Sequence, residues 1–69
     1  MVIVKEIEKT DITNRKVYAS LFADAKSEVS PSMEIVGMVD GYDLGVGSSV
    51  MTADGELAFL KSNNTWNWL

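Results

Sequence analysis

Hydrophobic and polar residues alternate most regularly in the last third of the chain, where the pattern predicts a three-strand β-meander over residues 48–69. Two short polar breaks divide this stretch, Asp54-Gly55 and Asn63-Asn64. Asp-Gly is typical of a two-residue type I′ turn, which needs positive φ at both central residues. Asn tolerates the left-handed region better than most residues. Two hairpins in succession are therefore expected.

Two-residue loops fix the register, pairing Val50 with Phe59 and Phe59 with Trp68. Successive side chains of a strand point to opposite faces. One predicted face is large and aromatic and is expected to be buried: Val50, Thr52, Leu57, Phe59, Lys61, Trp66 and Trp68. The other face mixes small apolar and polar groups: Met51, Ala53, Glu56, Ala58, Leu60, Asn67 and Leu69. A slip of one residue in either turn would exchange the faces of the strands beyond it.

The first half of the chain predicts a strand pair. Residues 1–9 are rich in β-branched side chains and end in alternating charges, a pattern that suits an edge strand, and residues 10–16 form a turn. Residues 17–29 allow two interpretations. Apolar residues at helical spacing allow a helix capped by Asn14, whereas the β-branched and aromatic start favours a strand through Ala23, followed by a short helical turn that Asp24 caps. We favour the strand, with a short helix within 17–29 as the alternative.

Residues 30–47 predict a glycine-rich connection with a short extended piece at 33–36. Pro31 restricts the residue before it and lacks an N–H. A connection of this length is unusual in a compact domain and suggests contacts outside the chain. The expected fold class is mainly β, with residues 1–69 forming one small domain built from an N-terminal strand pair and the C-terminal antiparallel meander.

The length and composition leave oligomerisation as the expected source of added stability. A chain of 69 residues buries only about 60% of its unfolded surface. The chain has no cysteine and no histidine, which excludes disulfides and the usual zinc sites. Association with other chains is the remaining means of stabilising so small a core.

The net charge of −4 argues against nucleic acid or an anionic membrane as the main partner. No apolar run approaches the roughly 20 residues that a membrane-spanning helix needs, and charge after four residues argues against a signal peptide.

No motif predicts catalysis, a cofactor or a metal. Gly45-x-Gly47 lacks the third glycine and the following helix of a dinucleotide fingerprint. The spacing of Asp40, Asp43 and Asp54 does not match a calcium loop. Without histidine or cysteine the usual bases and nucleophiles are missing, so we expect a protein that is not an enzyme.

The residues expected to mediate association are Phe59, Trp66 and Trp68 on one face of the meander, with Met51, Leu60 and Leu69 on the other. The tryptophans fit a buried core and a subunit contact equally well. A base-stacking platform is less favoured, because Lys61 is the only positive charge nearby.

A family resemblance supplies the functional hypothesis. Five stretches of the chain resemble small proteins encoded among the structural genes of tailed bacteriophages. They are Phe22 to Val29 (FADAKSEV), Asp40-Gly41-Tyr42, Gly47-Ser48-Ser49, Thr52 to Glu56 (TADGE) and the closing Thr65 to Trp68 (TWNW). The resemblance covers about two-thirds of the chain and carries over no catalytic residue.

This resemblance implies a non-enzymatic structural component of a bacteriophage virion, such as a minor head, decoration or fibre-associated protein. Such a protein would be made in the bacterial host cytoplasm and would pack with copies of itself, for example as a trimer, and with a larger virion protein. The alternative is a small acidic phage protein that inhibits a host enzyme or a nucleic-acid-binding protein by charge mimicry, although the acidic residues are scattered rather than clustered.

Overall fold

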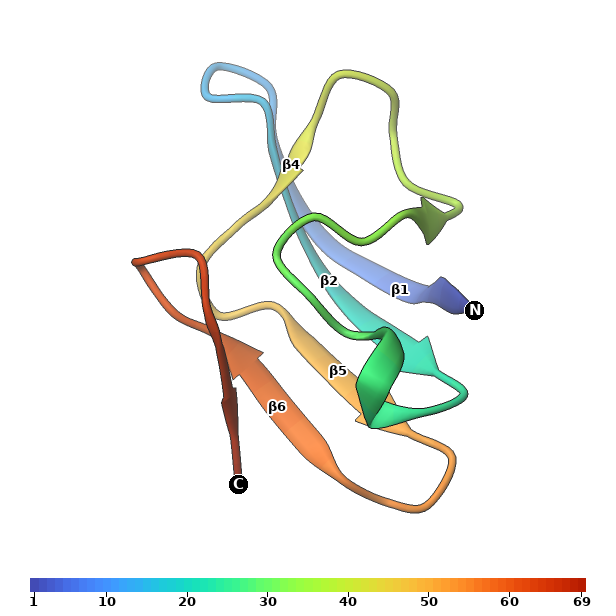
Figure 1. The fold of residues 1–69 in the computed structure, drawn as a ribbon. Coiled ribbons are helices and arrows are strands. Elements are labelled where there is room, and N and C mark those ends of the chain that lie inside the picture. The colour runs from blue at the N-terminus through green and yellow to red at the C-terminus, as the bar shows by residue number, and fades with distance from the viewer.

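One mixed β-sheet organises the chain (Figure 1). The computed structural model describes residues 1–69 and contains seven strands and one 3-10 turn. They are β1 (Val2–Asp11), β2 (Lys16–Ala23), η1 (Lys26–Glu28), β3 (Ile35–Val36), β4 (Asp43–Leu44), β5 (Ser49–Thr52), β6 (Leu57–Leu60) and β7 (Trp66–Trp68). The strand order is β3-β1-β2-β5-β6-β7, and β4 pairs with β2. The predicted mainly β fold is thus confirmed.

The N-terminal strand pair is the long antiparallel hairpin of β1 and β2, closed where Asp11 faces Lys16. Asn14 donates its backbone N–H and its side-chain amide to the Asp11 carboxylate, at 3.2 and 2.9 Å. Arg15 completes the turn with a φ of 53°. Asn14 therefore stabilises a turn between strands, and its predicted alternative role as a helix cap is wrong.

Residues 17–29 follow the favoured interpretation, with β2 running to Ala23 and η1 after it. Inward side chains of β2 are buried at every second position, namely Val17, Ala19, Leu21 and Ala23. The short turn does not use the expected cap, because its first flanking residue is Ala25, which makes no side-chain capping bond. Asp24 instead accepts a hydrogen bond from the Met1 amino group at 3.1 Å.

The C-terminal meander is present, but both of its loops are one residue longer than predicted. Thr52 bonds to Glu56 across residues 53–55, and Lys61 bonds to Thr65 across residues 62–64. Asp54 and Asn63 do not have positive φ; Gly55 (88°) and Asn64 (61°) do. This is the three-residue hairpin in which only the last loop residue is left-handed. The register predicted from two-residue turns was therefore wrong.

The longer loops move β6 by one residue, so Val50 faces Ala58 and Ala58 faces Trp68. Ala58 and Leu60 point inward and are buried, whereas Phe59 points outward. The second loop adds a second shift of one residue, which restores Trp66 and Trp68 to the inward face. The β6 residues therefore lie on the opposite face from the one predicted, whereas the residues of β5 and β7 lie on the predicted faces.

The connection from Asp24 to Leu44 crosses one face of the sheet (Figure 1). On its way it adds β3 parallel to β1 and then β4 parallel to β2. Six of its side chains pack on the buried core: Val29, Met33, Ile35, Met38, Tyr42 and Leu44. The connection therefore covers the chain's own sheet, and contacts outside the chain are not needed to explain its length.

Between β4 and β5 the chain bulges away from β2, and the Ser48 side chain replaces a backbone partner that β2 would otherwise lack. The Ser48 hydroxyl accepts the Ala19 N–H at 3.2 Å, which leaves this buried donor paired. Gly45 donates its N–H to Val17 at 2.9 Å, and the Tyr18 ring lies where a Cβ of residue 45 would stand. Only glycine fits there, because the ideal Cβ position is 2.2 Å from that ring.

Candidate functional site

The six residues expected to mediate association lie on both faces of the sheet, in a different grouping from the one predicted. We call the face under residues 24–44 the covered face and the opposite one the open face. Trp66, Trp68 and the buried Leu60 lie on the covered face. Met51, Phe59 and Leu69 lie on the open face and are 42%, 39% and 77% exposed. Phe59 and Leu60 have exchanged places relative to the prediction.

An apolar row crosses the open face from one edge of the sheet to the other. The registers place its members side by side: Val36 of β3, Ile3 of β1, Phe22 of β2, Met51 of β5, Leu57 of β6 and Leu69, whose N–H bonds to Leu57. Phe59 lies two residues beyond Leu57 on the same face. We refer to these seven residues as the apolar row. None of them belongs to the buried core or to the half-buried groups packed against it.

Four members of the row, Ile3, Phe22, Val36 and Leu57, were not among the residues expected to associate. The alternation within each strand showed that Ile3 and Phe22 share a face with their own i±2 neighbours. It did not show that their strands align them with Met51. That alignment depends on the parallel pairing of β2 with β5, which joins residues about thirty positions apart.

The tryptophans of β7 are partly covered by their own chain. Both pack against the buried core, and the Nζ of Lys26 lies 4.8 Å from the centre of the Trp68 ring. The same ammonium group is 3.9 Å from the Glu56 carboxylate. A cation over an indole face is attracted by the ring's electron density. The covering segment and β7 are therefore held together by packing and by this cation–π contact.

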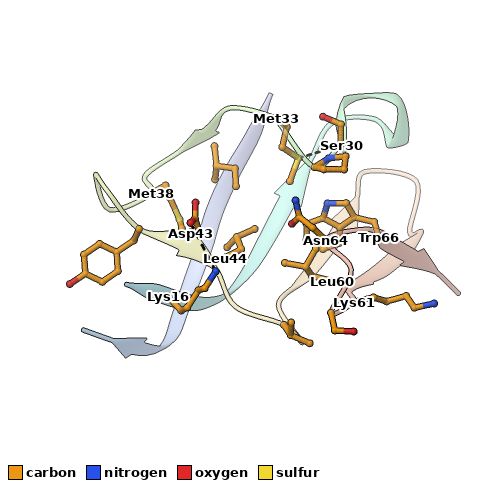
Figure 2. Close-up of a pocket in the computed structure, with 15 residues that line it drawn as sticks. Lys16, Ser30, Met33, Met38, Asp43, Leu44, Leu60, Lys61, Asn64 and Trp66 are labelled. Atoms are coloured by element: carbon orange, nitrogen blue, oxygen red, sulfur yellow. Dashed lines mark hydrogen bonds and ion pairs between the residues drawn. The ribbon is translucent and has the colours of Figure 1, made fainter. Parts of the chain in front are cut away.

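A groove of about 400 Å³ lies beside Trp66, between the covering segment and the β6–β7 hairpin (Figure 2). Its lining mixes apolar side chains, including Met33, Met38, Leu44 and Leu60, with polar and charged ones. Lys16 and Asp43 form an ion pair of 4.0 Å at one end. With Lys61 also in the lining, the groove presents both apolar and charged groups.

Three ionisable groups have a pKa displaced by neighbours. The Met1 amino group donates hydrogen bonds to the carboxylates of Glu28 and Asp24. These bonds, chiefly the one to Glu28, raise the pKa of the amino group, and the same amine lowers the pKa of Glu28. The two bonds from Asn14 lower the pKa of Asp11. These exposed groups lie at the two ends of the β1–β2 hairpin, so they stabilise its ends rather than form a reactive centre.

No three acidic side chains come close enough together to hold a metal ion. The structure has no helix with the length and hydropathy to cross a membrane.

Comparison with protein-family models, with curated proteins and with solved structures finds no match to this chain. The fold defines its class only as a small mixed β-sheet domain with one covered and one open face.

Proposed function

We propose that this protein is a non-enzymatic structural subunit of a bacteriophage virion, which works by packing its open face against copies of itself and a larger virion protein. The observation that carries the proposal is the apolar row, whose members come from six different strands or strand ends. Exposed apolar groups that are contiguous, rather than scattered singly, are characteristic of protein–protein contacts. The virion assignment depends on the sequence resemblance.

The size of the domain supports the same proposal. Only 11 of 69 residues are buried, and the chain has neither disulfide nor histidine to compensate for so small a core. Covering the apolar row with a neighbouring subunit would add burial without any change of fold. Each apolar square ångström removed from water contributes about 25 cal/mol.

The test compares two lysine substitutions by light-scattering mass across a dilution series. Met51→Lys puts a charge in the middle of the apolar row, and Ile12→Lys puts the same charge at a residue that is 75% exposed in the β1–β2 turn. We expect the unmodified chain to form an oligomer, Met51→Lys to shift it towards monomer, and Ile12→Lys to leave it unchanged. A monomer at every concentration would refute self-packing. Absence of the chain from purified particles of a phage that encodes it would refute the virion assignment.

A further inference from the structure

Strand β7 is an edge strand whose outer backbone groups have no partner. β7 pairs only with β6 and lies next to the C-terminus in Figure 1. Thr65 accepts from Lys61 and Leu69 donates to Leu57, so residues 65, 67 and 69 direct their backbone groups to β6. In an antiparallel ladder the intervening residues direct theirs the other way. The N–H and C=O groups of Trp66 and Trp68 therefore point outward from the sheet.

The opposite edge of the sheet carries charges and irregularities that oppose pairing, whereas the three residues of β7 carry neither. Beyond its short contact with β3, β1 carries Lys5, Glu6, Glu8 and Lys9 and has two register shifts. Charges and bulges of this kind block the addition of another strand. Residues 62–69 contain no charged side chain, and β7 has neither proline nor bulge. The two edges thus differ in the features that decide whether a strand can be added.

We infer that β7 pairs antiparallel with β7 of a second copy of this chain, about a two-fold axis through Asn67. This pairing rests on the proposed self-association and adds an edge-to-edge contact, which extends the sheet and leaves the apolar row available for packing. Trp66 of each copy then faces Trp68 of the other, and all four outward N–H groups meet outward C=O groups. An axis through Trp66 would instead set Trp68 against Asn64, which is held in the left-handed turn. The register with its axis through Asn67 is therefore the one in which every outward N–H and C=O group of Trp66 and Trp68 finds a partner.

The side chains also suit a second copy. At the axis the two Asn67 residues form a non-hydrogen-bonded pair, where side chains approach most closely, and each amide carries both a donor and an acceptor for the other. On the covered face, Trp66 and Trp68 form cross-strand aromatic pairs, which stabilise antiparallel sheets. Because each copy carries a net charge of −4, an uncharged edge is also where two copies meet with least repulsion.

Single cysteines test the register, because the chain has none of its own. Opposite residues of a non-hydrogen-bonded pair have Cα atoms about 4.5 Å apart, within the range of a disulfide. Asn67→Cys is therefore expected to form a disulfide-linked dimer under mild oxidation. Asn63→Cys is the matched control: it is exposed, but four residues from the axis, so its two copies would be more than about 20 Å apart and should remain unlinked.

A second substitution covers the case in which cysteine chemistry fails. Asn67→Lys sets two ammonium groups against each other across the axis and should abolish the dimer, whereas Asn63→Lys should not; circular dichroism checks that each variant folds. Equal cross-linking at both positions, or an unchanged mass for Asn67→Lys, overturns β7 pairing. If the unmodified chain still forms an oligomer that Met51→Lys disrupts, the proposed function stands without it. A monomer throughout overturns both.

Discussion

At the scale of single residues, this fold depends on a few close approaches between backbone and side chain. The closest is at Gly45, where the Tyr18 ring occupies the position of the absent Cβ. The Nζ of Lys9, a residue of β1, lies 5.5 Å from the centre of the same ring. The ring therefore links the end of the β1–β2 hairpin to the start of the bulge between β4 and β5.

Gly45→Ala is expected to destabilise the protein by about 1–3 kcal/mol, because the added methyl group must displace the Tyr18 ring. Chemical denaturation measures the change in the free energy of unfolding. In the background of Tyr18→Ala the obstacle is gone, so the same Gly45→Ala change should cost markedly less. Equal costs in the two backgrounds would show that the ring does not constrain this position.

At the scale of elements, the two hairpin loops decide which side chains the meander buries. A two-residue type I′ turn and a three-residue loop place opposite sets of β6 residues inward. The hydroxyl group of Thr52 favours the longer loop, since it accepts the Glu56 N–H at 3.1 Å and donates to Asp54. A side chain that begins the turn thus sets the register of the strand that follows it.

Glycine substitutions at Asn63 and Asn64 distinguish a two-residue loop from a three-residue loop in the second hairpin. Only Asn64 has positive φ, so Asn64→Gly relieves strain and should be neutral or stabilising. Asn63→Gly only increases the conformational entropy of the unfolded chain, so it should lower the free energy of unfolding by about 0.5–1 kcal/mol. Thermal and urea denaturation of both variants provide the comparison. A type I′ turn would instead favour glycine at both positions, and that result would restore the predicted register.

At the scale of the whole molecule, the connection over residues 24–44 makes the two faces unequal. It covers β7 and the inward side of β6 and leaves the apolar row open. Leu60 and Leu69, which a two-residue turn would place on one face, therefore have opposite environments. They are 5% and 77% exposed, respectively.

Matched leucine truncations measure this difference in the monomer. Leu60→Ala is expected to lower the free energy of unfolding by about 2–3 kcal/mol, because it leaves a cavity in the core. Leu69→Ala should change it by less than about 0.5 kcal/mol at concentrations where the chain is monomeric. If the two substitutions cost the same, the connection does not cover one face preferentially. A cost for Leu69→Ala that appears only at high concentration would place Leu69 in a subunit contact.

The sequence by itself determined most of the local structure. Alternating apolar positions predicted β1, β2 and the meander strands, and Asp54-Gly55 and Asn63-Asn64 located both turns, because these signals act over a few neighbouring residues. The loop lengths could not be predicted from the sequence. Whether a loop has two or three residues is decided by the hydrogen bonds of Thr52 and by which side chains the following strand can bury. Of the six predicted contact residues, Met51 and Leu69 lie on the open face as their alternation placed them, and Phe59 joins them only through the shifted register.

The tertiary structure alone decided the arrangement of these pieces. The parallel pairing of β2 with β5 and of β1 with β3 joins distant residues, and no local pattern encodes which strands will meet. The β2–β5 pairing sets Met51 beside Phe22, which the β1–β2 hairpin already places beside Ile3. The choice of covered face followed from the path of residues 24–44, whose apolar side chains are too irregularly spaced to reveal their target. Local periodicity fixes which side of a strand is apolar, whereas long-range packing fixes which apolar side remains open.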